Sequence, residues 1–169
     1  MDMYQKREMR KNKKMDENTK SLPSTSINWF PGHMAKTRRQ IEEDLKIIDV
    51  VIELLDARIP ISSRNPDIKR LTQNKKKIIL LNKCDLADEN TNSKWVSKLS
   101  KEAPTILTDS NSGKGIEKVS KAIENIMAEE VARQAARGRI NKTIRVMILG
   151  IPNVGKSSFI NRIAKIPLN

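Results

Sequence analysis

The sequence is poor in cysteine and in aromatic residues, and it lacks any long apolar run. Its one cysteine, Cys84, excludes a disulfide within the chain and any cysteine-based metal site. Aromatic residues make up 3%, so the stacking platforms of single-strand nucleic-acid binders are not indicated. No apolar run approaches the roughly 18 residues of a membrane-spanning helix, and the polar N-terminus has no signal-peptide core. We therefore expect a cytoplasmic protein with no membrane partner.

Acidic residues are also scarce relative to basic ones, which leaves a net charge of +13 from 33 Lys and Arg against 20 Asp and Glu. This excess points to a polyanionic partner, and RNA is the leading candidate because basic side chains release counterions from phosphates. Simple solubility is the alternative. Residues 1–25 are polar and charged and cannot bury enough apolar surface to order themselves. We expect a disordered basic extension there, either an RNA-binding arm or a solvated tail.

Beyond this extension, apolar runs alternate with helical patterns. The apolar runs predict strands at 49–55, 77–81, 105–107 and 144–149. Helical spacing predicts helices at about 35–46, 66–73, 90–100, 116–131 and after 157. Asn65 followed by Pro66 is typical of an N-cap and a first helical position. The alternation predicts one α/β domain over residues 26–169, with a parallel sheet and helices on both faces.

The most informative stretch is Gly150–Ser157, which spells G-x-x-x-x-G-K-S between the last strand and a short amphipathic helix. In such a loop, backbone N–H groups and the helix N-terminus turn toward one centre, which predicts a nucleotide phosphate site. Lys156 would reach the β- and γ-phosphates, and Ser157 would give its hydroxyl to Mg²⁺. The other residues expected at the phosphates are Asn153, Val154, Gly155 and Ser158. A glycine-rich turn that binds nothing is the alternative, and the full match disfavours it.

The stretch Asn82-Lys83-Cys84-Asp85 follows the second buried strand. A carboxylate at the position of Asp85 can accept hydrogen bonds from guanine N1–H and its exocyclic amine, which adenine does not offer. Asn82 would contact the base and tie its loop to the neighbouring one, and the stem of Lys83 would cover one face of the ring. Ser110, after the third strand, could donate its backbone N–H to guanine O6. N-K-x-D is a weak pattern alone, but the end of a buried strand is where open α/β sheets bind ligands.

The motif order, with N-K-C-D and Asp109-Ser110-Asn111 ahead of the phosphate loop, resembles that of circularly permuted GTPases. W-F-P-G-H-M at 29–34 and D-A-R-I-P-x-S-S-R-N-P at 56–66 resemble the ribosome biogenesis GTPase A family (YlqF or RbgA). The resemblance runs from about residue 27 to the end. It implies binding of GTP or GDP and a role in assembly of the large ribosomal subunit and contact with its rRNA. It further implies that Asn153 can be a K⁺ ligand and that His33 is the catalytic residue that places the attacking water.

The resemblance also predicts a strand order. The strand before the phosphate loop should lie at one edge, followed in space by the first, second and third strands of the chain. The family continues with a switch threonine, a D-x-P-G segment and a helical domain that this sequence lacks. We therefore expect a circularly permuted P-loop GTPase fold, truncated after the phosphate-loop helix. Two functions stand at this point: a GTPase of large-subunit assembly, or a non-hydrolysing basic fragment that binds RNA or the ribosome.

Overall fold

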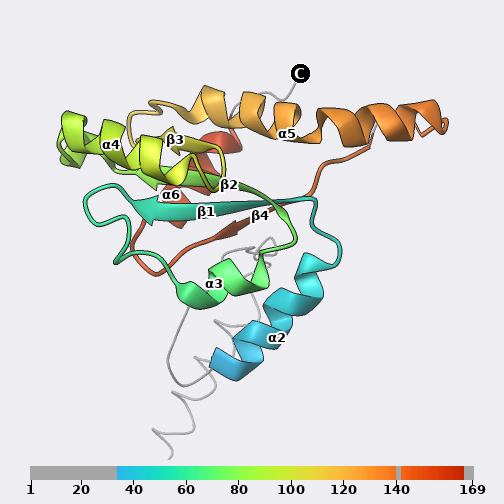
Figure 1. Ribbon diagram of the computed structural model, residues 1–169, viewed down its shortest axis with the longest axis horizontal. Helices are drawn as coiled ribbons and strands as arrows, with labels where there is room; N and C mark the ends of the chain where they lie inside the picture. The colour runs from blue at the N-terminus through green and yellow to red at the C-terminus, as the bar shows by residue number, and fades with distance from the viewer. Residues whose placement is uncertain (1–33, 140–141, 166–169) are drawn as a thin grey trace, which may run out of the picture.

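The computed structural model describes residues 34–139 and 142–165 (Figure 1). The strands are β1 (Val50–Asp56), β2 (Lys76–Asn82), β3 (Thr105–Leu107) and β4 (Val146–Leu149). The helices are α2 (Met34–Leu45), α3 (Pro66–Leu71), α4 (Glu89–Leu99), α5 (Ile116–Ala136) and α6 (Lys156–Ile163), and a 3-10 turn, η2, covers Cys84–Leu86. Every predicted strand and helix is present, with ends shifted by a few residues. The predictions for residues 1–25 and for His33 lie outside the described residues.

The strands form one parallel sheet in the order β3-β2-β1-β4. This is the predicted order, and β4, which leads into the phosphate loop, has a neighbour on one side only within the described part of the chain. Asp56 at the end of β1 is in register with Asn82 at the end of β2. Because all strands run the same way, their carboxyl ends meet at one edge of the sheet.

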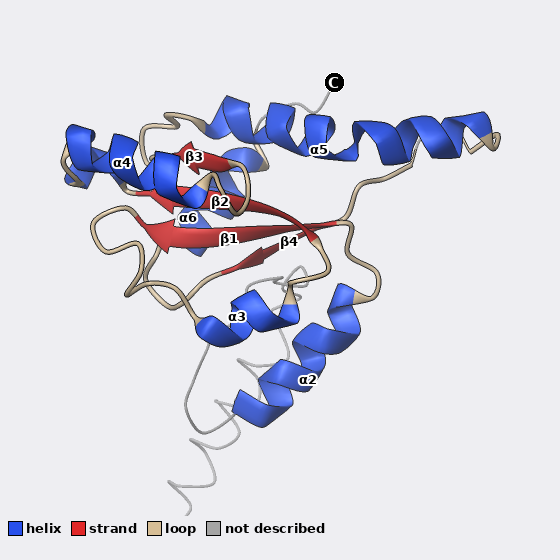
Figure 2. Ribbon diagram, in the orientation of Figure 1, coloured by secondary structure: helices blue, strands red, loops and turns tan. Residues whose placement is uncertain are grey.

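Helices cover both faces of the sheet, as predicted (Figure 2). Even-numbered strand residues such as Ile52, Leu80 and Ile148 pack in one core with residues of α5 and α6. Odd-numbered residues face the opposite layer, where α2 and α3 pack on β1 and β4 and α4 packs on β1 and β2. All seven positions of β1 are buried, because this strand lies in the interior of the sheet with helices on both sides.

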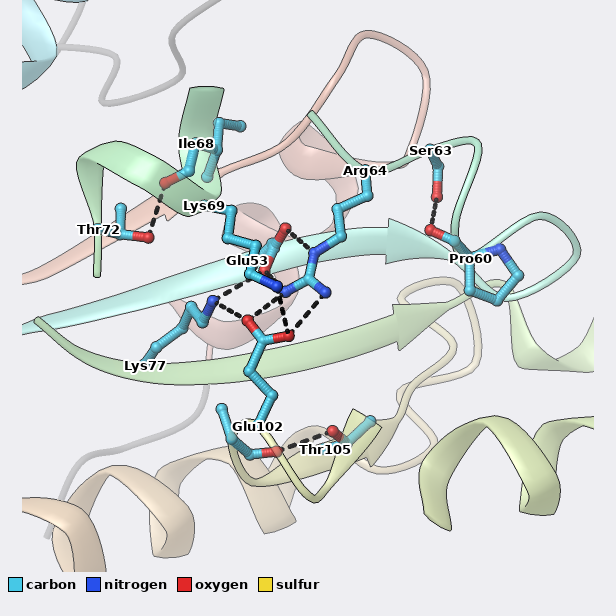
Figure 3. Close-up of polar contacts among 11 residues, drawn as sticks. Glu53, Pro60, Ser63, Arg64, Ile68, Lys69, Thr72, Lys77, Glu102 and Thr105 are labelled. Carbon is cyan, nitrogen blue, oxygen red and sulfur yellow. Dashed lines mark hydrogen bonds and ion pairs between the residues drawn. The ribbon is translucent and has the colours of Figure 1, made fainter. Parts of the chain in front are cut away.

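One charged side chain, Glu53, lies in the middle of β1 and is 1% exposed (Figure 3). Arg64 donates to it through two nitrogens, Nε at 2.9 Å and Nη2 at 2.8 Å. Arg64 also binds Glu102 at 2.6 and 2.8 Å, and the ammonium of Lys77 lies 2.7 Å from Glu102 and 3.4 Å from Glu53. A buried carboxylate needs such fork-shaped partners to offset its desolvation. The network therefore fastens the loop after β1 to the centre of the sheet.

The start of α3 confirms the predicted cap. Asn65 Oδ1 accepts a hydrogen bond from the Asp67 amide at 2.8 Å, and Pro66 takes the first helical position, where no N–H is needed.

None of the helices described combines the length and the apolar character that crossing a membrane requires.

Candidate functional site

The predicted site lies at the carboxyl edge of the sheet, where β1, β2 and β4 end beside one another. The phosphate loop leaves β4 through Gly150, and a Cβ there would lie 2.7 Å from the Leu54 carbonyl oxygen and 3.0 Å from Val154 Cγ2. Only glycine fits this approach. Asn153 and Gly155 have positive φ values of 67° and 96°, a left-handed conformation that turns the chain into α6. Within residues 34–139 and 142–165 no side chain caps α6, which leaves its first-turn N–H groups to an anion.

Lys156 is 6% exposed, and its ammonium donates to the Gly150 carbonyl at 3.0 Å and the Ile151 carbonyl at 2.8 Å. Burial lowers its pKa. Among the described residues it forms no salt bridge. A buried cation held only by carbonyl oxygens is a group that an anion would stabilise. Ser157 and Ser158, exposed in the first turn of α6, complete a surface whose donors fit a phosphate chain.

Asn82 joins three segments of the site and is 2% exposed. Its amide nitrogen donates to the Val154 carbonyl in the phosphate loop at 2.8 Å. Its oxygen accepts from the Ser110 amide at 3.1 Å, the Ser110 hydroxyl at 2.8 Å and the Thr108 hydroxyl at 3.4 Å. The link between loops that the sequence predicted for Asn82 is therefore present, whereas its contact with a base stays a prediction.

The rest of the N-K-C-D segment is held from several sides. Lys83 adopts a left-handed backbone conformation with φ 59°, and its ammonium donates to the Asn153 carbonyl at 2.5 Å. Cys84 donates its amide to the Thr108 carbonyl at 3.2 Å, and its carbonyl accepts from Asn92 Nδ2 at 3.0 Å. Asp85 follows with an exposed carboxylate. The Asp85 carboxylate is thus exposed to solvent, next to a backbone that the hydrogen bonds of Lys83 and Cys84 hold in place.

Ser110 lies beside Asn82, as predicted, but its amide is used inside the cluster. The N–H expected at guanine O6 donates to Asn82 Oδ1 instead, so a contact with the base would require it to be shared. The next two amides are held by the Asp109 carboxylate, at 2.9 Å from Asn111 and 3.1 Å from Ser112. Hydrogen bonding from the Ser112 side chain, together with these two amide bonds, holds the pKa of Asp109 below its usual value. The loop is thus shaped by its own side chains.

Comparison with known proteins finds relatives of this sequence among ribosome-related GTPases. Residues 145–167 match a family described as 50S ribosome-binding GTPase. The chain is 48% identical over 140 residues to ribosome biogenesis GTPase A of Bacillus licheniformis, which covers 82% of this chain and 50% of that protein. The Bacillus cereus protein of the same name is 44% identical over 140 residues, covering 82% of this chain and 47% of that protein. The chain belongs to the ribosome biogenesis GTPase A family.

More distant relatives carry related names. Mitochondrial ribosome-associated GTPase 1 of Mus musculus is 39% identical over 139 residues, covering 81% of this chain and 42% of that protein. The chain spans about half the length of the ribosome biogenesis GTPase A sequences it matches, between 47% and 50%.

Asp56 and Arg58 also lie beside the candidate site, although the sequence analysis assigned neither of them a role. Asp56, the first residue of D-A-R-I-P-x-S-S-R-N-P, accepts from the Arg58 amide and Nε at 3.0 Å each and from Nη2 at 2.7 Å. Hydrogen bonding to Arg58 lowers the pKa of Asp56 to about 2. The available signal was a carboxylate at the end of a buried strand, which the parallel sheet places beside the N-K-C-D segment.

Proposed function

We propose that this chain is the guanine-nucleotide-binding part of a GTPase that acts in assembly of the large ribosomal subunit. The observation that carries the proposal is Lys156, a buried ammonium without a carboxylate partner in the described residues, at the uncapped start of α6. An anionic phosphate chain is the ligand that satisfies both features. The exposed Asp85 at the same sheet edge gives the site its preference for guanine.

In this proposal the backbone of Asn153 to Ser158 and the ammonium of Lys156 hold the phosphates of GTP or GDP. The Ser157 hydroxyl is an oxygen ligand of the kind that Mg²⁺ prefers, and the ion would neutralise charge on the phosphates. Asn153, exposed at the tip of the loop, is proposed as a K⁺ ligand. His33 is proposed to orient the attacking water, on the resemblance alone, because it lies outside the described residues.

Circular permutation is part of the proposal. The phosphate-loop strand β4 comes last along the chain, but in the sheet it lies beside β1. N-K-C-D and Ser110 follow β2 and β3, which lie on the other side of β1. In this arrangement a loop that ordinarily opens a nucleotide-binding domain follows the base-binding segments in sequence while remaining next to them in space.

A second function, binding to ribosomal RNA, is supported by lysines on α4 and just after it. Lys94 and Lys98 lie one helical turn apart on α4, Lys101 follows the end of the helix, and none of the three forms a salt bridge within the described part of the chain. Together with Ser93 and Ser97 they line a shallow hollow of about 440 Å³. A lysine face without carboxylates fits the phosphate backbone of a folded RNA. RNA contact could therefore operate with or without nucleotide hydrolysis.

Guanine selectivity tests the nucleotide site. Asp85→Asn should weaken GTP binding by about 10- to 100-fold, since charged hydrogen bonds contribute about 1.5–3 kcal/mol each. It should shift preference toward xanthosine triphosphate, because the amide donates where the carboxylate accepted. Affinities are measured by displacement of a fluorescent GDP analogue. The matched control is Asp88→Asn, which removes the same charge from the α4 cap and leaves the cap functional. Equal affinity of the parent chain for ATP and GTP would contradict the proposal.

A further inference from the structure

Asp56 lies at the junction of β1 with the nucleotide site, but it is not among the residues expected to touch the ligand. Its side chain is 6% exposed, and it is in register with Asn82, whose carbonyl accepts from the Ala57 amide at 2.8 Å. Its own amide donates to the Ser63 hydroxyl at 3.0 Å, and that hydroxyl donates to the Pro60 carbonyl at 3.1 Å (Figure 3). The backbone at Asp56 is thus held by the neighbouring strand and the following loop, and its carboxylate by Arg58.

The fixed carboxylate also reaches the base-recognition segment. Asp56 Oδ2 lies 3.4 Å from the ammonium of Lys83, and the same ammonium donates to the Asn153 carbonyl of the phosphate loop. One lysine head group therefore connects β1, the segment after β2 and the phosphate loop. A long, flexible lysine loses much rotamer freedom in such a position, so it needs partners that hold it there.

The backbone of Lys83 makes this support more important. Residues other than glycine rarely adopt a positive φ such as the 59° of Lys83. This backbone conformation persists where surrounding contacts impose it. Asn82 fastens the segment on one side of Lys83, and the Cys84 hydrogen bonds fasten it on the other. Asp56 supplies the only carboxylate within salt-bridge distance of Lys83 among the described residues.

We propose that Asp56 is a positioning residue of the guanine-nucleotide site, which acts by holding Lys83 between the base-recognition segment and the phosphate loop. The inference rests on the proposed nucleotide binding and assigns a role to the first residue of the D-A-R segment. Arg58 also binds this carboxylate, and among the described residues it forms no hydrogen bond with the phosphate loop.

A double-mutant cycle tests whether Asp56 acts through Lys83. Asp56→Asn, Lys83→Met and the double variant are compared with the parent chain by GDP affinity, with a fluorescent analogue and Mg²⁺. Asp56→Asn should weaken GDP binding by about tenfold, and the double variant should match Lys83→Met within about twofold, because contacting residues are not additive. Asp56→Glu keeps a carboxylate within reach of Lys83 and should retain GDP affinity within about threefold of the parent. A purely structural role would give additive losses.

The control is Asp49→Asn at the other end of the same strand. Asp49 lies 2.8 Å from Lys142 and accepts from the Arg145 amide at 2.9 Å, so its loss should lower the unfolding midpoint without changing GDP affinity. Additive losses in the cycle, or unchanged GDP affinity in a folded Asp56→Asn variant, would overturn the inference and leave the proposed function intact. Should Asp56→Asn not fold, loss of GDP affinity in a folded Asp56→Glu would overturn it as well. A parent chain that binds ADP as well as GDP would instead overturn the proposed function.

Discussion

Asn82→Asp is a small change of shape that removes one specific contact from the centre of the site. An aspartate can still accept from the Ser110 amide and hydroxyl and from the Thr108 hydroxyl. It cannot donate to the Val154 carbonyl, which lies 2.8 Å from the present amide nitrogen. A carboxylate oxygen would face that carbonyl oxygen at a position that is 2% exposed. The phosphate loop must then move away or the new carboxyl must take up a proton.

The expected loss follows from the burial of both groups. A buried carbonyl left without a donor costs about 1–3 kcal/mol, and the added buried charge is only partly offset by the Ser110 donors. We expect the free energy of unfolding to fall by about 2–4 kcal/mol. Because Val154 belongs to the phosphate loop, part of this cost should appear in ligand binding, as a loss of about tenfold or more in GDP affinity, or about 1.4 kcal/mol.

Urea unfolding measures the stability change, and displacement of fluorescent GDP measures the affinity. The control is Thr72→Val, which removes one buried hydrogen bond, from the Thr72 hydroxyl to the Ile68 carbonyl at 2.7 Å, far from the phosphate loop. It should destabilise the chain by about 1 kcal/mol without changing GDP affinity. If Asn82→Asp lowers stability but leaves GDP affinity unchanged, the Val154 contact does not shape the phosphate loop and the reasoning is wrong.

Two further predictions concern charge. Partners lower the pKa values of Glu102 and Asp56 to about 2, from ordinary values of 4.5 and 3.8, so the stability they contribute is present above those ordinary values and is lost as pH falls toward 2. The unfolding midpoint should therefore drop between about pH 4.5 and 2, less steeply in Glu102→Gln; a midpoint that is flat over this range would contradict the ion network. Replacing Lys94, Lys98 and Lys101 by Gln should reduce the salt dependence of binding to large-subunit particles by about two to three powers of salt concentration. The same change at the exposed Lys118 and Lys121 of α5 is the control, and an equal effect there would remove α4 from the RNA interface.

The sequence predicted the fold well because the relevant signals are local. Each strand is a short apolar run, each helix has a cap or a spacing of its own, and the phosphate loop from Gly150 to Ser157 is contiguous. The Asn82 link was predictable because N-K-C-D follows a strand next to another motif-bearing strand. These features depend on neighbours in sequence or on the fixed direction of parallel strands.

The ion network and the use of the Ser110 amide could not be predicted in this way. Arg64 is 11 residues from Glu53 and 38 from Glu102, so no periodic pattern connects them. Residues 50–55 read as an apolar strand, and the charge of Glu53 becomes acceptable only when Arg64 and Lys77 are folded against it. Likewise, the direction of the Ser110 amide is decided by Asn82, which lies 28 residues earlier.

The D-A-R-I-P-x-S-S-R-N-P segment divides into parts that face opposite ways. Asp56 binds Arg58 and lies within salt-bridge distance of Lys83, Ser63 accepts from the Asp56 amide, and Arg64 enters the ion network at Glu53. The loop is therefore fastened both to the base-recognition segment and to the middle of β1. Loss of Arg64 would leave Glu53 buried without its fork-shaped partner, and the first element released would be the loop that holds Asp56. If Asp56 positions Lys83 as proposed, any effect of Arg64 on nucleotide affinity would act through these two residues.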